Sequence, residues 1–167
     1  MRHLLLLASL VALAVPTLPA HAQHAHGEGK LDVVIDKDSI AINLELPLDA
    51  AVGFERAPKN EREKAALAAA EKILGDAALF VPTPAANCKP QPPKVVMPAY
   101  GAKAGADDHG DIDASYAFRC ANPAALKSIE TGIFKNFKRL YRLEAQRVGP
   151  SGQGKQRLTP KNPAITW

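Results

Sequence analysis

The chain has 167 residues, of which 47% are hydrophobic and 23% charged, and its formal net charge is +4. This composition is typical of a folded protein with one domain and a real core, and it excludes a largely disordered chain. The mild positive charge, without basic clusters interleaved with aromatic residues, argues against a nucleic-acid partner.

Residues 1–22 have the pattern of a secretory signal peptide. A positively charged start precedes the apolar stretch 4–15, and a small-x-small cleavage site follows at Ala20 and Ala22. The apolar stretch is shorter than the about 20 residues that a membrane-spanning helix needs. We therefore expect cleavage, export and no membrane insertion of the mature chain. An uncleaved N-terminal anchor is the alternative.

Cleavage would expose a short histidine-containing tail, residues 23–30. His24 and His26 are two residues apart, so both side chains project to the same side of an extended segment. Neutral imidazole is a good zinc ligand, and this pair therefore predicts part of a metal site. A solvated tail without metal is the alternative. Copper is the alternative ion, because the amine of Gln23 and the imidazole of His24 could together chelate Cu(II).

The first structured segment should be a β-hairpin over residues 31–46. Apolar residues alternate there on either side of the turn sequence 36–39. A helix should follow, because Asn60 is a good N-cap, Glu63 completes a capping box and Gly75 suits the C-terminal end. The apolar stripe of this helix consists of Ala66, Leu67, Ala70, Ile73 and Leu74.

The middle of the chain contains shorter segments. Residues 79–81 are a short apolar segment, and residues 82–98 are rich in proline and should be extended, with a strand at 94–97. Residues 99–112 are rich in Gly, Ala and Asp and should form a loop. Residues 115–120 alternate again and predict another strand.

A second helix is expected from Asn122 and Pro123 to Phe137. Asn is a good cap and Pro suits the first helical position. Its core face would contain Leu126, Ile129, Ile133, Phe134 and Phe137.

The last segments should be a strand over 140–148, a turn over 149–154, and a final strand through Leu158 or over 164–167. The order ββ-α-β-β-α-β-β lacks the long crossovers of parallel sheets. We therefore predict an α+β fold over 31–167, with a mostly antiparallel sheet and two helices on one face.

The two cysteines, Cys88 and Cys120, should form a disulfide in an oxidising compartment. A site with two thiolate metal ligands is the alternative, although no Cys-x-x-Cys spacing favours it.

A second group of candidate metal ligands lies in and just after the loop. His109 is the remaining histidine beyond the tail, and it alternates with carboxylates in a pattern without the late Glu of a calcium loop. A solvated loop is the alternative. The carboxylates that could complete a zinc shell here or beside the tail are Asp107, Asp108, Asp111, Asp113, Glu28 and Glu55.

Several short motifs together resemble the ZrgA-type proteins, which are bacterial periplasmic proteins associated with zinc uptake. The similarity covers nearly the whole chain after the signal peptide. The motifs are His24-Ala25-His26-Gly27, Leu31-Asp32-Val33, Leu44-Glu45-Leu46-Pro47, Gly53-Phe54-Glu55 with Pro58, Tyr116-Ala117-Phe118-Arg119-Cys120, Asn122-Pro123 and Phe134-Lys135-Asn136-Phe137.

The resemblance implies an exported periplasmic protein that binds zinc and buffers it or delivers it to an uptake system. Its partners would be the metal ion and a component of a zinc importer. Two features depart from the family pattern. Arg56 follows Gly-Phe-Glu where the family commonly has His, and residues 107–113 replace a longer insert rich in His and Asp.

Catalytic signatures are absent from the sequence. It contains no Gly-x-Ser-x-Gly and no His-Glu-x-x-His motif. Two carboxylates distant in sequence could still meet in the fold. We expect a binding protein that is not an enzyme, and a cell-envelope interaction or structural module without metal is the alternative.

Overall fold

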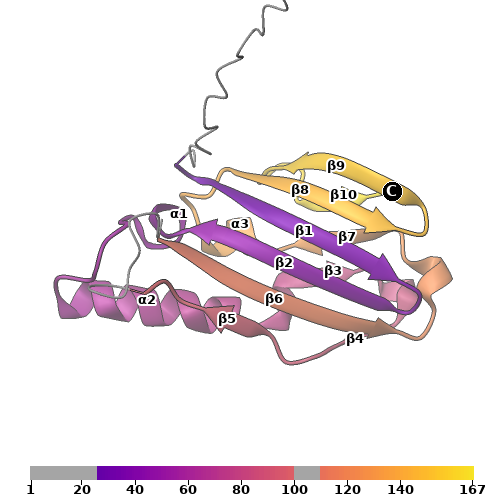
Figure 1. Ribbon diagram of the computed structural model, residues 1–167, viewed down its shortest axis with the longest axis horizontal. Coiled ribbons are helices and arrows are strands. Elements are labelled where there is room, and N and C mark those ends of the chain that lie inside the picture. Colours follow the sequence, from indigo (N-terminus) through magenta and orange to yellow (C-terminus); the bar gives the residue numbers. More distant parts are fainter. Residues whose placement is uncertain (1–25, 100–109) are drawn as a thin grey trace, which may run out of the picture.

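The computed structural model describes residues 26–99 and 110–167 (Figure 1). Its strands are β1 (Glu28–Asp36), β2 (Ser39–Pro47), β3 (Phe80–Pro82), β4 (Cys88–Pro90), β5 (Lys94–Val96), β6 (Asp111–Cys120), β7 (Ser128–Thr131), β8 (Arg142–Gly149), β9 (Gly152–Leu158) and β10 (Ala164–Thr166). Its α-helices are α1 (Leu48–Val52), α2 (Glu61–Leu74) and α3 (Ile133–Asn136), and its 3-10 helices are η1 (Ala77–Leu79), η2 (Pro84–Ala86) and η3 (Pro123–Ala125). The fold is α+β and rich in sheet, as predicted.

The strands form two sheets. The larger has the order β4-β6-β2-β1-β8-β9, with β5 also paired to β6, and it lies in front in Figure 1. The smaller has the order β10-β7-β3 and lies behind it. The expected antiparallel pairing is confirmed for most neighbours, but β1 and β8 run parallel. This parallel pair places the start of β1 beside Arg142, at the start of β8.

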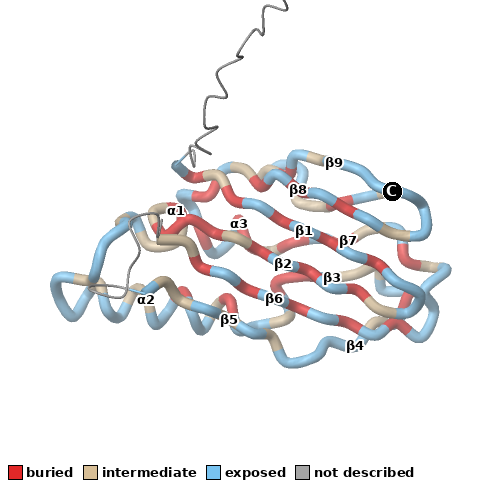
Figure 2. The backbone as a smooth tube through the Cα atoms, in the orientation of Figure 1, coloured by how far each residue is buried: buried red, intermediate tan, exposed pale blue. Residues whose placement is uncertain are grey.

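The large sheet buries one face. Along β1, β2 and β6 buried and exposed residues alternate, which Figure 2 shows as alternating red and pale blue. The predicted hairpin is confirmed, with β1 beginning at Glu28, three residues before the expected start. The buried face carries Leu31, Val33, Ile40, Ile42, Leu44, Ile112, Tyr116 and Phe118.

Helix α2 has the bounds and the apolar face that the sequence predicts. The side chain of Asn60 caps it by accepting a hydrogen bond from the Glu63 amide, at 2.9 Å. At the other end, the buried hydroxyl of Tyr116 donates to the carbonyl oxygen of Leu74, at 2.7 Å. This bond attaches the end of α2 to the inner face of the large sheet.

The predicted capping box differs in one bond. The Glu63 carboxylate accepts from the backbone amide of Lys59 instead of that of Asn60, and it also accepts two hydrogen bonds from the Arg56 guanidinium. The bonds from Arg56 and then from Lys59 lower the pKa of Glu63 to about 2. Glu63 therefore joins the segment after α1 to the first turn of α2.

We expect Glu63→Gln to lower the free energy of unfolding at neutral pH. Because the folded-state pKa of about 2 lies below the ordinary value of 4.5, the stabilising contribution is complete above pH 4.5 and disappears as the pH falls toward 2. Denaturant unfolding of both proteins should therefore give curves that converge over this range. Glu61→Gln, an exposed neighbour in the same turn, is the matched control. A stability difference that stays constant down to pH 2 would contradict this account.

The prediction of a second helix over 122–137 is wrong. Pro123 begins only the short helix η3, and Ser128–Thr131 forms strand β7, the middle strand of the small sheet. Only Ile133–Asn136 is α-helical. Ile129 and Thr131 are buried β-branched residues that favour a strand, and Gly132 interrupts a helix.

Smaller corrections concern the ends of the loops. Asp111 and Ile112, expected in the loop 99–112, belong to β6, while residues 100–109 lie outside the described residues. The turn expected over 149–154 is shorter, because β9 begins at Gly152, and both alternatives for the last strand occur, as β9 and β10. In the described part of the chain, no helix has the length and apolar character of a membrane span.

Candidate metal centre

His26, Asp49 and Glu55 meet at the end of the large sheet where β1 begins. His26 and Gly27 form the turn that leads into β1, and Asp49 lies in α1, which follows β2 directly. Figure 1 shows α1 beside the start of β1. Glu55 follows Gly53, which ends α1 in the left-handed conformation at φ 89°. Three segments thus contribute one side chain each.

Helix α1 is fixed by its own buried side chains. Leu48 and Ala50 are buried, and the Leu48 amide donates to the carbonyl oxygen of Gly110 at 2.8 Å. The backbone around Gly110 also lies close to Glu55. Because Leu48 and Ala50 face the core, the intervening Asp49 is turned toward the protein surface at His26.

The ligand atoms of the three residues lie close together. His26 Nδ1 is 3.1 Å from Asp49 Oδ2 and 3.6 Å from Glu55 Oε1. All three ligand atoms lie within 4.8 Å of one another, the one such group of His, Cys, Asp and Glu found in residues 26–99 and 110–167. Zinc bonds of about 2.0–2.2 Å imply neighbouring ligand atoms roughly 3.3 Å apart in a tetrahedral shell. The two separations, of which the shorter is also a hydrogen-bond contact, lie on either side of this value.

Asp49 is the least exposed of the three side chains. Its exposed fraction is 20%, compared with 46% for Glu55 and 79% for His26. Asp49 Oδ1 is buried and has no hydrogen-bond partner among the described residues. A buried carboxylate oxygen is costly without a partner. A bound cation would supply one, while His26 and Glu55 stay accessible for ion entry.

Glu28, another candidate ligand from the sequence, lies two residues after His26 and is bonded to other side chains. It accepts a hydrogen bond from the Tyr141 hydroxyl at 2.7 Å and pairs with the Arg142 guanidinium. The bond from Tyr141 and then the interactions with Arg142 hold the pKa of Glu28 below its ordinary value. Glu28 therefore joins the start of β1 to β8 and is not part of the cluster of His26, Asp49 and Glu55.

Arg56, which follows Gly53-Phe54-Glu55, also has a structural role. Its guanidinium binds Glu63 at 2.7 Å and lies over the Phe54 ring, 5.1 Å from its centre. It thus fixes the segment between α1 and α2 that carries Glu55.

The structure brings together two of the ligands predicted from the sequence, His26 and Glu55. Asp49 was missed, although Pro47 and Gly53 bracket a short helix and could have indicated its turn. Asp111 and Asp113 lie on β6, opposite Pro47 and Glu45, and belong to no metal-ligand group in the described residues. Burial and the neighbouring Glu45 raise the pKa of Asp113. The predicted ligands outside the described residues are His24, Asp107, Asp108 and His109.

The sequence was also compared with known protein families and with curated proteins. A family model described as ZrgA family zinc uptake protein matches residues 23–167, nearly the whole chain. No match was found among curated proteins.

Proposed function

The chain belongs to the ZrgA family of zinc uptake proteins, and from this premise we propose that it binds zinc through His26, Asp49 and Glu55. The observation that carries the proposal is the convergence of one imidazole and two carboxylates at separations suited to a zinc shell. The buried, unpartnered oxygen of Asp49 supports it.

The donor set is suited to reversible binding. One imidazole and two carboxylates make a harder and weaker site than the multiple thiolates of structural zinc centres. The exposure of His26 and Glu55 allows an ion to enter and leave. We therefore infer a protein that buffers zinc or delivers it to an importer component, and not an enzyme. The signal-peptide pattern of residues 1–22 supports action in the periplasm.

A zinc titration tests this function directly. The chain 23–167, purified without a histidine tag and treated with EDTA, should take zinc from a chromophoric chelator of micromolar affinity at pH 7.5. Failure to compete would contradict a zinc-binding role and favour an interaction module of the cell envelope.

The affinity should also depend on pH. Imidazole and carboxylates bind metal in their deprotonated forms, so protons compete with zinc. Imidazole is ordinarily protonated below about pH 6.5. Below that pH, the zinc affinity should fall about tenfold for each pH unit. The same titration at pH 7.5, 6.5 and 5.5 measures this. A flat response would indicate a site built from carboxylates alone.

A further inference from the structure

Tyr141 packs against the residue that follows His26. Gly27 has a φ of 74°, which strongly favours glycine, and a Cβ atom added there would lie 2.7 Å from the Tyr141 ring. The Tyr141 amide donates to the Gly27 carbonyl oxygen at 3.0 Å. The ring and the backbone of Tyr141 thus both contact the glycine, and only glycine allows so close an approach.

The hydroxyl of Tyr141 makes a second attachment. It donates to Glu28 Oε1 at 2.7 Å, and Glu28 is also paired with Arg142 at the first position of the parallel β1–β8 register. Tyr141 therefore contacts both residues that follow His26. These contacts fix the direction in which the chain enters β1, and with it the position of the His26 imidazole.

We propose that Tyr141 is a positioning residue of the metal centre, which holds the turn at Gly27 and the start of β1 so that His26 faces Asp49 and Glu55. This inference rests on the proposed zinc function. Tyr141 contributes no metal ligand in this account; its contacts reduce the conformational freedom that His26 would otherwise lose on binding the ion.

A merely structural role makes a different prediction. The Tyr141 side chain is half exposed, so its hydroxyl should contribute less to the stability of the fold than a buried hydroxyl does. Tyr116 offers the opposite case, because its hydroxyl is buried and bonded to Leu74 of α2, away from the cluster. The same chemical change at these two positions separates positioning from stability.

The experiment compares Tyr141→Phe with Tyr116→Phe in the chain 23–167. Zinc affinity is measured by chelator competition and stability by thermal unfolding without metal. Tyr141→Phe should lower zinc affinity about tenfold, the lower end of the range for groups that orient a metal ligand, with a smaller drop in unfolding temperature than Tyr116→Phe. Tyr116→Phe should lower the unfolding temperature and leave zinc affinity unchanged.

A spectroscopic titration adds a readout that general destabilisation would not move. With Co²⁺ in place of zinc, Tyr141→Phe should keep the shape of the wild-type absorption spectrum at saturation while its midpoint moves to higher Co²⁺ concentration. Equal zinc affinities of the wild type and Tyr141→Phe would overturn the positioning role alone. An equal loss of affinity in Tyr116→Phe would also overturn it. A wild-type protein that binds no zinc would overturn the proposed function, and the positioning role with it.

Discussion

His26→Ala should lower the zinc affinity of the chain 23–167 at least about 100-fold, while its unfolding temperature stays unchanged. The imidazole is the one nitrogen ligand of the proposed shell and lies 3.1 Å and 3.6 Å from the two carboxylate oxygens. Its loss should exceed the roughly 10- to 100-fold effect of groups that only orient a ligand. The side chain is 79% exposed, so its removal should barely affect folding. Chelator competition and thermal unfolding measure the two quantities.

Two matched carboxylate variants test whether Asp49 is a zinc ligand. Asp49→Asn should weaken zinc binding strongly, because it neutralises the ligand that lies 3.1 Å from His26. Asp113→Asn makes the same change on β6 beside Glu45, outside the cluster, and should leave the affinity unchanged. A larger loss from Asp113→Asn than from Asp49→Asn would mean that the ion binds elsewhere.

His24→Ala and His109→Ala complete the set, since both residues are ligands predicted from the sequence. Each removes one imidazole, as His26→Ala does, and the cluster found in the described residues consists of His26, Asp49 and Glu55. We expect both to reduce affinity less than His26→Ala does. If one of them abolished binding while His26→Ala had no effect, the proposed site would be wrong.

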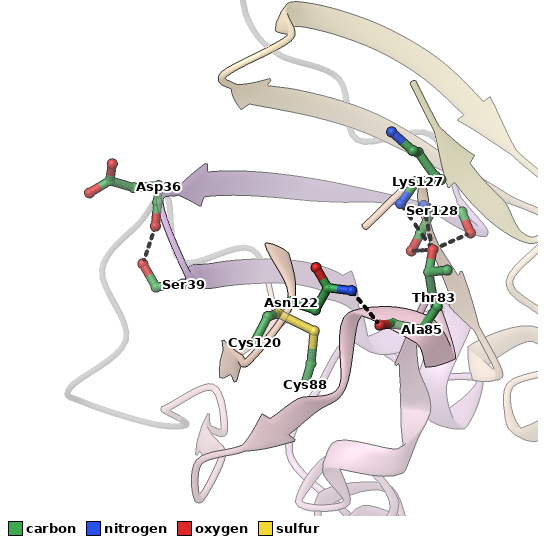
Figure 3. Close-up of a disulfide and its surroundings, with 9 residues drawn as sticks. All are labelled: Asp36, Ser39, Thr83, Ala85, Cys88, Cys120, Asn122, Lys127 and Ser128. Atoms are coloured by element: carbon green, nitrogen blue, oxygen red, sulfur yellow. Dashed lines mark hydrogen bonds between the residues drawn. A yellow bond between two sulfur atoms is a disulfide. The ribbon is translucent and has the colours of Figure 1, made fainter. Parts of the chain in front are cut away.

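Replacing both cysteines by alanine should lower the free energy of unfolding by about 3–4 kcal/mol, the loop-entropy value for a separation of this length. Cys88 and Cys120 are bonded, are 32 residues apart, and join β4 to β6 (Figure 3). Denaturant unfolding of the oxidised wild type and the double variant measures the difference. A loss below about 1 kcal/mol would contradict the expected constraint on the unfolded chain.

The double variant should still bind zinc with wild-type affinity under conditions where it is folded. Cys120 ends the ten-residue strand β6, whereas Gly110, just before its first residue, contacts the α1 region. A strand of this length separates the two ends by about 30 Å. A lower zinc affinity in the folded double variant would mean that the disulfide also shapes the metal centre.

Local patterns in the sequence predicted the elements whose signals are contained in a few neighbouring residues. The β1–β2 hairpin follows from alternation around a turn, and α2 follows from its cap at Asn60 and its apolar stripe. The residues after Asn122 show the limit of such patterns. Leu126, Ile129 and Ile133 have helical spacing, but Ile129 lies in β7, the middle strand of the small sheet. Pairing with the neighbouring strands is a tertiary effect that periodicity does not reveal.

The candidate site could be predicted only in part for the same reason. The histidine cluster identified His26, and the similarity to a zinc-uptake family drew attention to Glu55. Asp49 joins them because β2 ends at Pro47 and α1 turns its second residue toward the start of β1. The parallel pairing of β1 with β8, which positions Tyr141 at Gly27, links segments distant in the sequence and has no local signal.

Anomalous diffraction from crystals of the zinc-loaded chain 23–167, recorded on both sides of the zinc absorption edge, tests the central claim most directly. The account predicts a zinc peak about 2.0–2.2 Å from His26 Nδ1 and from carboxylate oxygens of Asp49 and Glu55. A fully occupied zinc ion bound elsewhere, with these three side chains unligated, would contradict it.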